Sequence, residues 1–161
     1  MSGTTTDIER RLRALEDQFA ILQAMASYGP QVDAGLPDAT ASIWTEDGVY
    51  DAQVGVFDGR AGIAAMVRGP MHQEIIAGGS AHVIGMPVIH VTGDTAVTTC
   101  YARLYRADGQ NGWKVWRVTA NRWEWERTAE GWKVKHRVNR VLDGTQAARD
   151  LLARCFEPVV R

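Results

Sequence analysis

The sequence predicts a single α+β domain built on a strongly curved, mostly antiparallel sheet. Three helical segments and one early strand precede four further strands and one final helix, without the strand–helix alternation of a parallel sheet. In residues 113–142, two Val-, Trp- and Arg-rich runs flank the polar segment Thr128–Gly131, which favours a hairpin. Its two strands are expected to be about 14 and 11 residues long. Strands of that length usually curl, and a curled sheet has a concave surface.

Length and composition are those of an ordinary globular domain. The chain has 161 residues, 45% of them hydrophobic and 23% charged, and its net charge of −1 argues against binding to nucleic acid or acidic membranes. Its two cysteines fit a reduced compartment or a fortuitous pair. No apolar run reaches 18 residues and Met1–Thr6 is polar, so we expect a cytoplasmic protein. Residues 1–161 should form one domain, with 1–5 disordered and 144–161 forming a C-terminal helix and tail.

The first element is expected to be an amphipathic helix opened by the capping box Thr6-x-x-Glu9. Apolar side chains then recur every three or four residues: Ile8, Leu12, Leu15, Phe19, Leu22 and Met25. Gly29-Pro30 should kink or end this helix, with residues 31–33 as a last turn or a short continuation. Asp33 then lies at the negative end of the helix dipole, where its carboxylate is either solvated, part of an Asx-type turn toward Gly35, or present for a function.

The remaining elements follow from periodicity and from glycine and proline breaks. We expect helices at residues 37–44, 62–68 and 147–155, with another turn of helix at residues 71–76. Besides the long hairpin, we expect strands at residues 49–51, 80–91 and 95–106. Turns are expected at residues 45–48 and 57–60.

Simple catalytic and binding motifs are lacking. The four histidines have no metal-binding spacing (His72, His82, His90 and His136). The sequence also contains neither a glycine-rich nucleotide loop nor a nucleophile elbow. Six tryptophans among arginines could stack on single-stranded nucleic acid, but the interleaved glutamates and the near-neutral charge argue against it. Spacing alone therefore indicates an α+β domain with room for a pocket.

Several short motifs run along the chain in a fixed order. They are Tyr28-x4-Asp33, Ile43-Trp44 before Asp47-Gly48-Val49-Tyr50, Gly59-Arg60, His82 followed by Pro87, Gly93-Asp94-x-Ala96, and Gly131-Trp132-Lys133-Val134-x-x-Arg137. Together they resemble the SnoaL-like branch of the nuclear transport factor 2-like (NTF2-like) superfamily over nearly the whole chain. The resemblance implies a cone-shaped sheet wrapped around a deep pocket that the N-terminal helices close.

Within that branch the chain is most similar to cofactor-free lyases, namely scytalone dehydratase, hexachlorocyclohexane dehydrochlorinase and bile acid 7α-dehydratase. The resemblance implies a catalytic set and a substrate-binding set, with no cofactor and no metal. The catalytic residues would be His82, Asp33, Arg137 and Tyr28. Substrate contacts would come from Tyr50, Asn121 and Tyr105. Tyr105 departs from the pattern, since the bile acid enzyme has an acidic residue there, and Gly85 or Met86 replaces an Asn.

The Asp–His pair suits proton transfer. A neutral imidazole with one free nitrogen can abstract a proton, and a buried carboxylate on the other nitrogen fixes the ring and stabilises the imidazolium. We therefore expect a lyase that eliminates water or another small group from an apolar cyclic or aromatic substrate. An isomerase or cyclase, a retro-aldol-type lyase and a non-catalytic protein that binds a small hydrophobe are the alternatives.

Two further expectations concern the hairpin. Regular pairing about the turn puts Asn121 and Arg137 on opposite faces, so both reach the pocket only if the hairpin carries a β-bulge. Its outer face carries Trp116, Val118 and Val141, which are costly to leave in water. We therefore expect a homo-oligomer, with a trimer favoured, formed through the sheets or the 147–155 helix.

Overall fold

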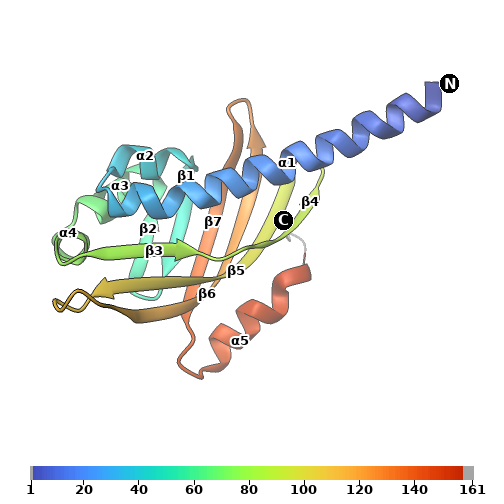
Figure 1. The fold of residues 1–161 in the computed structure, drawn as a ribbon. Coiled ribbons are helices and arrows are strands. Elements are labelled where there is room, and N and C mark those ends of the chain that lie inside the picture. Colours follow the sequence, from blue (N-terminus) through green and yellow to red (C-terminus); the bar gives the residue numbers. More distant parts are fainter. Residues whose placement is uncertain (1, 158–161) are drawn as a thin grey trace.

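The computed structural model describes residues 2–157 and confirms the predicted α+β class (Figure 1). The helices are α1 (Ser2–Asp33), α2 (Pro37–Ser42), α3 (Gly59–Arg68), α4 (Pro70–Ala77) and α5 (Gln146–Ala153), followed by a short 3-10 turn (Arg154–Phe156). The strands are β1 (Trp44–Ala52), β2 (Gly55–Asp58), β3 (Ser80–Ile84), β4 (Val88–Thr92), β5 (Thr95–Ala107), β6 (Trp113–Thr128) and β7 (Gly131–Val141). The described part of the chain has no helix that is both long and apolar enough to cross a membrane.

All seven strands belong to one curved, unclosed sheet. Its order is β2-β1-β7-β6-β5-β3, with β4 also paired to β5. Only β1 and β7 run parallel among the described strands, and every other pair is antiparallel. The predicted hairpin is β6–β7, whose strands have 16 and 11 residues. These long strands, together with β5, provide the concave surface that the N-terminal helices cover (Figure 1).

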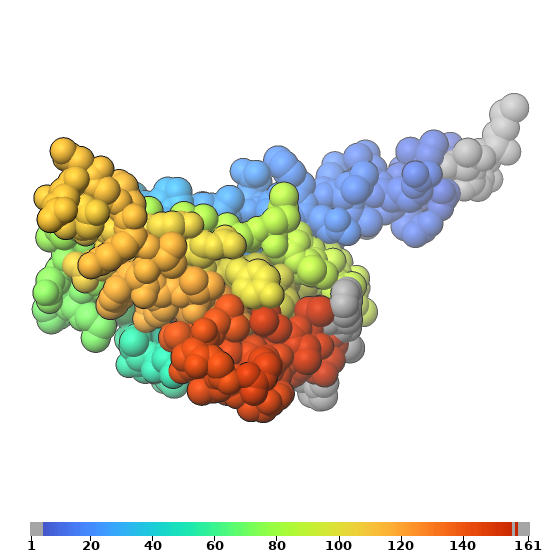
Figure 2. Space-filling view, turned by 60° about the horizontal axis from the view of Figure 1, so that its bottom comes forward, coloured from blue at the N-terminus to red at the C-terminus, as the bar shows by residue number. Residues whose placement is uncertain are grey.

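The two faces of the sheet carry separate cores, because side chains alternate along each strand. On the inner face, Trp123 and Trp125 are fully buried and their rings stack 5.7 Å apart. On the outer face, Ala120 packs under Ala148 and Leu151 of α5, which lies against the sheet in Figure 2. The expected 147–155 helix thus buries its apolar side on its own sheet.

The early strands differ from the prediction. Residues 45–48 were expected to turn, but β1 runs through them with an irregular register between Trp44 and Val49. Gly48 makes this path accessible, since a Cβ there would lie 2.8 Å from both the Trp44 ring and the Val134 carbonyl oxygen. The predicted turn at 57–60 is also wrong. There, β2 pairs with β1 and α3 begins at Gly59, which adopts a positive φ of 67°.

The expected strand 80–91 is two strands. The backbone N–H of Gly85 still donates to the Tyr101 carbonyl at 2.8 Å, but Pro87 has no N–H to continue the ladder. The chain therefore leaves the sheet at residues 85–87 and returns as β4, which pairs with a different part of β5. Hydrophobic alternation alone does not reveal this break.

The first helix also begins and ends differently from the prediction. It starts at Ser2, so residues 2–5, expected to be disordered, lie in α1, and the supposed capping box is inside the helix. The helix continues through Pro30 to Asp33. Residues 1 and 158–161 lie outside the described part of the chain.

Asp17 fastens α1 to the tip of the β6–β7 hairpin. Its carboxylate accepts hydrogen bonds from Arg127 Nη1 (2.6 Å) and Nη2 (2.8 Å) and from Trp132 Nε1 (3.0 Å). The Arg127 guanidinium also lies 4.4 Å from the centre of the Trp132 ring. The hydrogen bonds from Arg127 lower the pKa of Asp17 although burial opposes this.

Asp17→Asn should therefore destabilise the protein by about 1–3 kcal/mol near neutral pH, because it removes a charged hydrogen-bond acceptor. A lowered folded-state pKa stabilises the protein above the ordinary pKa of the group, and that stabilisation is lost as pH falls through the folded value. The difference in melting temperature between Asp17→Asn and wild type should thus shrink below about pH 4. Asp38→Asn, at an exposed ion pair with Arg68, is the control and should differ little from wild type. An equal loss in both variants would contradict the assignment.

Candidate active site

A cavity of about 650 Å³ lies between the concave face of the sheet and the helices, a volume within the range of small-molecule sites. Much of its lining comes from one contiguous segment, residues 54–75, which comprises parts of β2, α3 and α4. That segment supplies mainly apolar side chains, among them Val54, Phe57 and Met66. The polar lining comes from several elements and comprises Tyr28, Tyr50, His72, His82, Arg117, Arg137 and Asn139, among others. The cavity is thus a mainly apolar space with a few polar groups.

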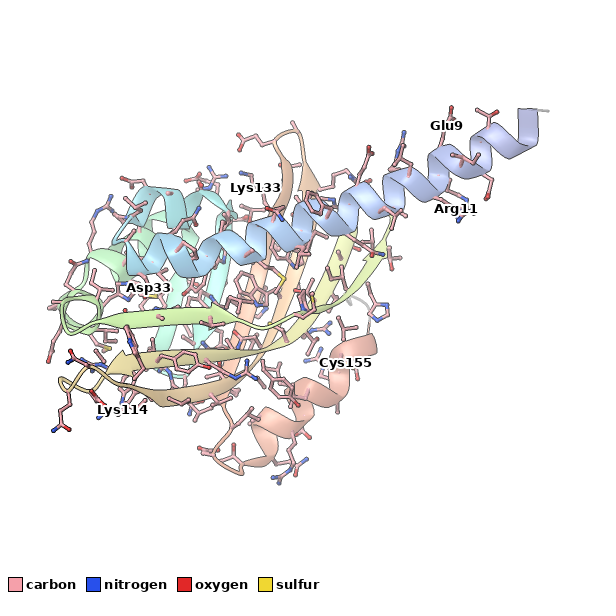
Figure 3. The ribbon with its side chains drawn as sticks, in the orientation of Figure 1. Glu9, Arg11, Asp33, Lys114, Lys133 and Cys155 are labelled. Carbon is pink, nitrogen blue, oxygen red and sulfur yellow. The ribbon has the colours of Figure 1, made fainter. Side chains whose placement is uncertain are left out.

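Asp33 and His82 form a directly hydrogen-bonded pair at the junction of α1 and β3. Asp33 is the last residue of α1, and Figure 3 shows it beside β3. Its Oδ1 lies 2.6 Å from His82 Nδ1, and its Oδ2 accepts the backbone N–H of His82 at 2.6 Å. The Ser80 hydroxyl donates to Oδ1 at 2.7 Å. These bonds explain why a carboxylate lies at the unfavourable end of the helix dipole.

The surroundings of Asp33 determine which nitrogen of His82 carries the proton. Burial acts to raise the pKa of Asp33, but the hydrogen bonds from the His82 ring, the His82 backbone and Ser80 together hold it below its usual value. The carboxylate is therefore ionised at neutral pH and accepts a hydrogen bond from Nδ1–H. In the neutral ring Nε2 then has a free lone pair. None of the described residues forms a hydrogen bond to Nε2, and His82 lines the cavity.

Gly29 allows α1 to approach β3 closely enough for this pair to form. A Cβ at position 29 would lie 2.1 Å from the backbone carbonyl oxygen of His82. The sequence indicated that Gly29-Pro30 kinks or ends the helix, but the helix passes through both residues. The glycine is needed for close packing.

Gly29→Ala should destabilise the fold by about 1–3 kcal/mol, since backbone atoms would have to move to admit the methyl group. The same movement would separate Asp33 from His82, so the hydrogen bond between them should be lost as well. Gly62→Ala is a matched control in α3, where the new Cβ would lie at an ordinary 3.6 Å from its nearest neighbour. That control should be neutral or stabilising by about 0.5–1 kcal/mol. Thermal unfolding of both variants tests this, and equal melting temperatures would contradict the close-packing role.

Arg137 is a buried cation within an aromatic cage. Its guanidinium carbon lies 4.1 Å from the ring centre of Trp123, 4.3 Å from Tyr28 and 4.4 Å from Tyr50. Nε and Nη2 both donate to Asn121 Oδ1, at 3.2 and 2.9 Å. This contact requires the predicted bulge, which is present as a register shift between Glu124 and Trp125 that pairs Asn121 with Asn139.

One donor of Arg137 is left over. The side chain lines the cavity and is only 2% exposed, yet its Nη1 has no hydrogen-bond partner among the described residues. No carboxylate among those residues pairs with this cation either. A buried cation with an unused donor is costly unless something accepts that hydrogen bond. An acceptor oxygen on a bound molecule would satisfy it.

The other predicted residues divide into two groups. Tyr28 and Tyr50 line the cavity, and the Tyr50 hydroxyl accepts a hydrogen bond from Asn139 Nδ2 at 2.6 Å. Burial raises the pKa of Tyr50 far above its usual value, although Arg137 opposes this, so its hydroxyl stays protonated. Asn121 does not line the cavity and instead supports Arg137 from behind. Tyr105 is not a lining residue either, because it pairs with Ala81 and so lies one residue out of step with His82.

His72 and Asn139 line the cavity but were not predicted as site residues. The His72 ring lies 5.6 Å from the His82 ring, centre to centre, and its Nε2–H donates to the Val32 carbonyl at 2.8 Å. Asn139 holds the Tyr50 hydroxyl. No sequence spacing links His72 with His82, but Asn139 lies two residues after Arg137 on the same strand face, which could have indicated it.

Two predictions about the surroundings can also be compared with the structure. Trp116, expected on the outer face of the hairpin, lines the cavity, since the β5–β6 register shifts between Leu104 and Tyr105. Both cysteines are free thiols, and burial raises the pKa of Cys100 to about 11. Within residues 2–157, no cluster of three or more His, Cys, Asp or Glu side chains is arranged to hold a metal ion.

Comparison with known proteins places these features in context. The SnoaL-like domain family matches residues 13–138. An NTF2-like protein with a cystatin-like fold from Novosphingobium aromaticivorans is 40% identical, with a TM-score of 0.88 over 91% of this chain and 96% of that one. A candidate aromatic ring hydroxylase from the same organism is 27% identical (TM-score 0.61, covering 80% and 90%). ActVI-ORFA from Streptomyces coelicolor shares the fold at 19% identity (TM-score 0.67, covering 76% and 93%). A search of curated proteins gives no significant match.

Proposed function

Because the chain belongs to the SnoaL-like family of the NTF2-like superfamily, we propose that its cavity is an active site in which Asp33 and His82 transfer a proton of an apolar cyclic or aromatic substrate. The family includes polyketide cyclases and dehydratases. The observation that carries the proposal is the 2.6 Å contact between Asp33 and His82, with the other imidazole nitrogen unpaired in an apolar cavity.

The proposed reaction begins at His82 Nε2. This nitrogen takes a proton from a carbon next to a carbonyl group, and the C–H electron pair moves toward the carbonyl oxygen. The imidazolium that forms is stabilised by the Asp33 carboxylate, whose hydrogen bond to Nδ1–H also fixes the ring. Ser80 and the His82 backbone N–H hold the carboxylate in turn, so the pair is preorganised before substrate binds.

Arg137 is suited to the developing negative charge. Its unused Nη1–H can donate a hydrogen bond to the carbonyl oxygen of the substrate, and its positive charge stabilises the enolate more than the neutral ketone. In an elimination, the electron pair of the enolate then forms the new double bond and expels a hydroxyl group. Tyr28 donates a proton to that group, which leaves as water. The imidazolium of His82 then releases its proton to solvent, and the tyrosinate takes one up, which returns both side chains to their starting state.

The lining favours a flat, apolar ring substrate. Aromatic and aliphatic side chains surround the cavity, and the caged guanidinium is itself planar. An isomerase or cyclase, or a retro-aldol-type lyase, would use the same first proton transfer and differ in the bond that changes next. A non-catalytic binding protein would need no such pair, and the direct Asp33–His82 contact favours the enzyme.

The test uses the purified protein and a panel of cyclic β-hydroxy ketones and aromatic ketones in deuterated buffer. Mass spectrometry follows deuterium uptake at the carbon next to the carbonyl and the loss of water. We expect protein-dependent exchange for the ketones and dehydration for the hydroxy ketones, unchanged by a chelator and without added nicotinamide, flavin or metal. Compounds that bind in the cavity with neither exchange nor product would identify a binding protein instead.

A further inference from the structure

The N-terminal half of α1 projects away from the rest of the molecule. Figures 1 and 2 show it extending past the sheet without any other element beside it. Every residue from 5 to 16 is exposed, and the buried residue that follows them is Asp17, where Arg127 fastens the helix to the hairpin. An isolated helix of this length is only marginally stable in water. Because residues 5–16 are exposed, this projecting segment lacks the tertiary packing that normally stabilises a helix, and a binding partner would supply it.

The projecting segment carries a continuous apolar stripe. Ile8, Leu12, Leu15 and Phe19 are 57%, 54%, 64% and 62% exposed. Their spacings of four, three and four residues are those of the a and d positions of a coiled coil. With Leu12 at a and Leu15 at d, the repeat runs from Thr5 to Leu22, about two and a half heptads.

This stripe, which we call the α1 seam (Ile8, Leu12, Leu15 and Phe19), faces away from the body of the protein. The side that packs on the body is marked by the buried residues Asp17, Ile21 and Met25. At about 100° per residue, these positions lie on the far side of the helix from the seam. The seam is therefore free of the protein's own sheet and accessible to another molecule.

The charges beside the seam indicate which molecule fits it. Arg11 occupies a g position, and Glu9 and Glu16 occupy e positions. In a parallel pair of identical helices, Arg11 of one chain lies next to Glu16 of the other, which is attractive. In the antiparallel arrangement, Glu9 of one chain would face Glu16 of the other, which is repulsive. Figure 3 shows Glu9 and Arg11 on the projecting part of α1, clear of the sheet.

We infer that the α1 seam binds the same seam of a second copy of this chain, forming a short parallel coiled coil. This gives the homo-oligomer predicted from sequence a different interface from the expected sheet or C-terminal helix. The globular part of each chain would then lie on the outer side of its own helix, away from the contact between the two helices. The cavity of each chain would stay separate from the interface, so assembly and activity can be tested independently.

Sedimentation equilibrium of wild type and of Leu12→Glu and Leu15→Glu tests the inference. Wild type should sediment as two chains, and each variant should raise the dissociation constant by roughly 10²-fold or more, because every substitution removes two buried leucines per dimer. The substituted positions are exposed within one chain, so the melting temperature of the folded body should stay the same, while the unpartnered projecting helix should lose part of its circular dichroism signal. Met86→Glu, at another exposed apolar residue, is the control and should leave the dimer intact. A monomeric wild type, or seam variants that associate like wild type, would overturn the inference.

Orientation has its own test. In a Cys155→Ser background, Leu15→Cys should form an interchain disulfide readily, since d positions of parallel helices meet their own copy. Arg11→Glu should weaken the dimer, and adding Glu16→Arg should restore it. A seam-dependent dimer that neither cross-links through position 15 nor recovers with the charge exchange would overturn the parallel arrangement.

Discussion

His82→Ala is expected to lower turnover by roughly 10²–10⁴-fold while leaving the fold and ligand affinity nearly intact. The side chain is the proposed base, and it lines the cavity without supporting the core. Asp33→Asn should cause comparable damage. The amide can hold the ring in the wrong tautomer and carries no charge to stabilise the imidazolium. Because the two residues act as one unit, the double variant should be little slower than the poorer single variant.

Deuterium uptake at the substrate carbon measures this effect for each variant, and titration of a bound ketone measures affinity. His90→Ala is a suitable control because His90 is an exposed residue of β4 that does not line the cavity. If the pair were only structural, His82→Ala would lower the melting temperature and leave exchange unchanged per folded molecule. Unchanged turnover in His82→Ala would therefore end the proposed mechanism and favour a binding protein.

Arg137→Met is expected to lower turnover by roughly 10²–10³-fold, which is typical of removing one donor that stabilises an oxyanion. Methionine fills a similar length of the aromatic cage without the charge, so the fold should survive. Replacing a buried charge by an apolar group is often neutral or stabilising, which here offsets the lost partner of Asn121. Arg137→Lys should rescue little, since an ammonium cannot place one nitrogen on Asn121 and another in the cavity within a planar stack.

Arg122→Met is the matched control, because Arg122 is also a buried arginine of the hairpin, with 1% exposure. Its Nη1 and Nη2 donate to the carbonyl oxygens of Arg154 and Glu157, on the outer side of the sheet. This variant should lose stability and keep its turnover per folded molecule. Measuring both kcat and the melting temperature of the two variants distinguishes a role in the reaction from a role in stability. Equal turnover in Arg137→Met and wild type would exclude Arg137 from the chemistry.

Only part of the candidate site followed from the residues themselves, and the pairing of Asp33 with His82 was implied by the resemblance to known lyases. The position of Asp33 at the end of the first helix was visible as a carboxylate at the wrong end of a helix dipole. The need for a β-bulge followed from strand parity, and the bulge is where Arg137 and Asn121 come to one face. Such features depend on backbone rules that act over a few residues, so one sequence is enough to predict them.

Other features depend on contacts between distant segments. Gly29 reads as a helix breaker, and only the nearby carbonyl of His82 explains why a glycine is there. His72 reaches the site through the packing of α4, which no spacing encodes. The interruption of the strand at residues 85–87 depends on the way in which β3 and β4 pair with different parts of β5. Tyr105 and Asn121 were both expected to contact substrate. The pairing of β3 with β5 puts Tyr105 one residue out of step with His82, whereas Asn121 shares the face of Arg137 but accepts its hydrogen bonds instead of lining the cavity.

The contiguous lining segment 54–75 has a consequence for redesigning the protein. The proposed chemistry resides on α1, β3 and β7, whereas this segment contributes mainly the shape of the opposite wall. Several of its side chains are well exposed, including Val54, Val56 and Met71. Exchanging residues 54–71 for the corresponding stretch of a related protein should therefore alter which rings fit without moving the Asp33–His82 pair. A library confined to these positions would sample new substrates on an unchanged catalytic frame.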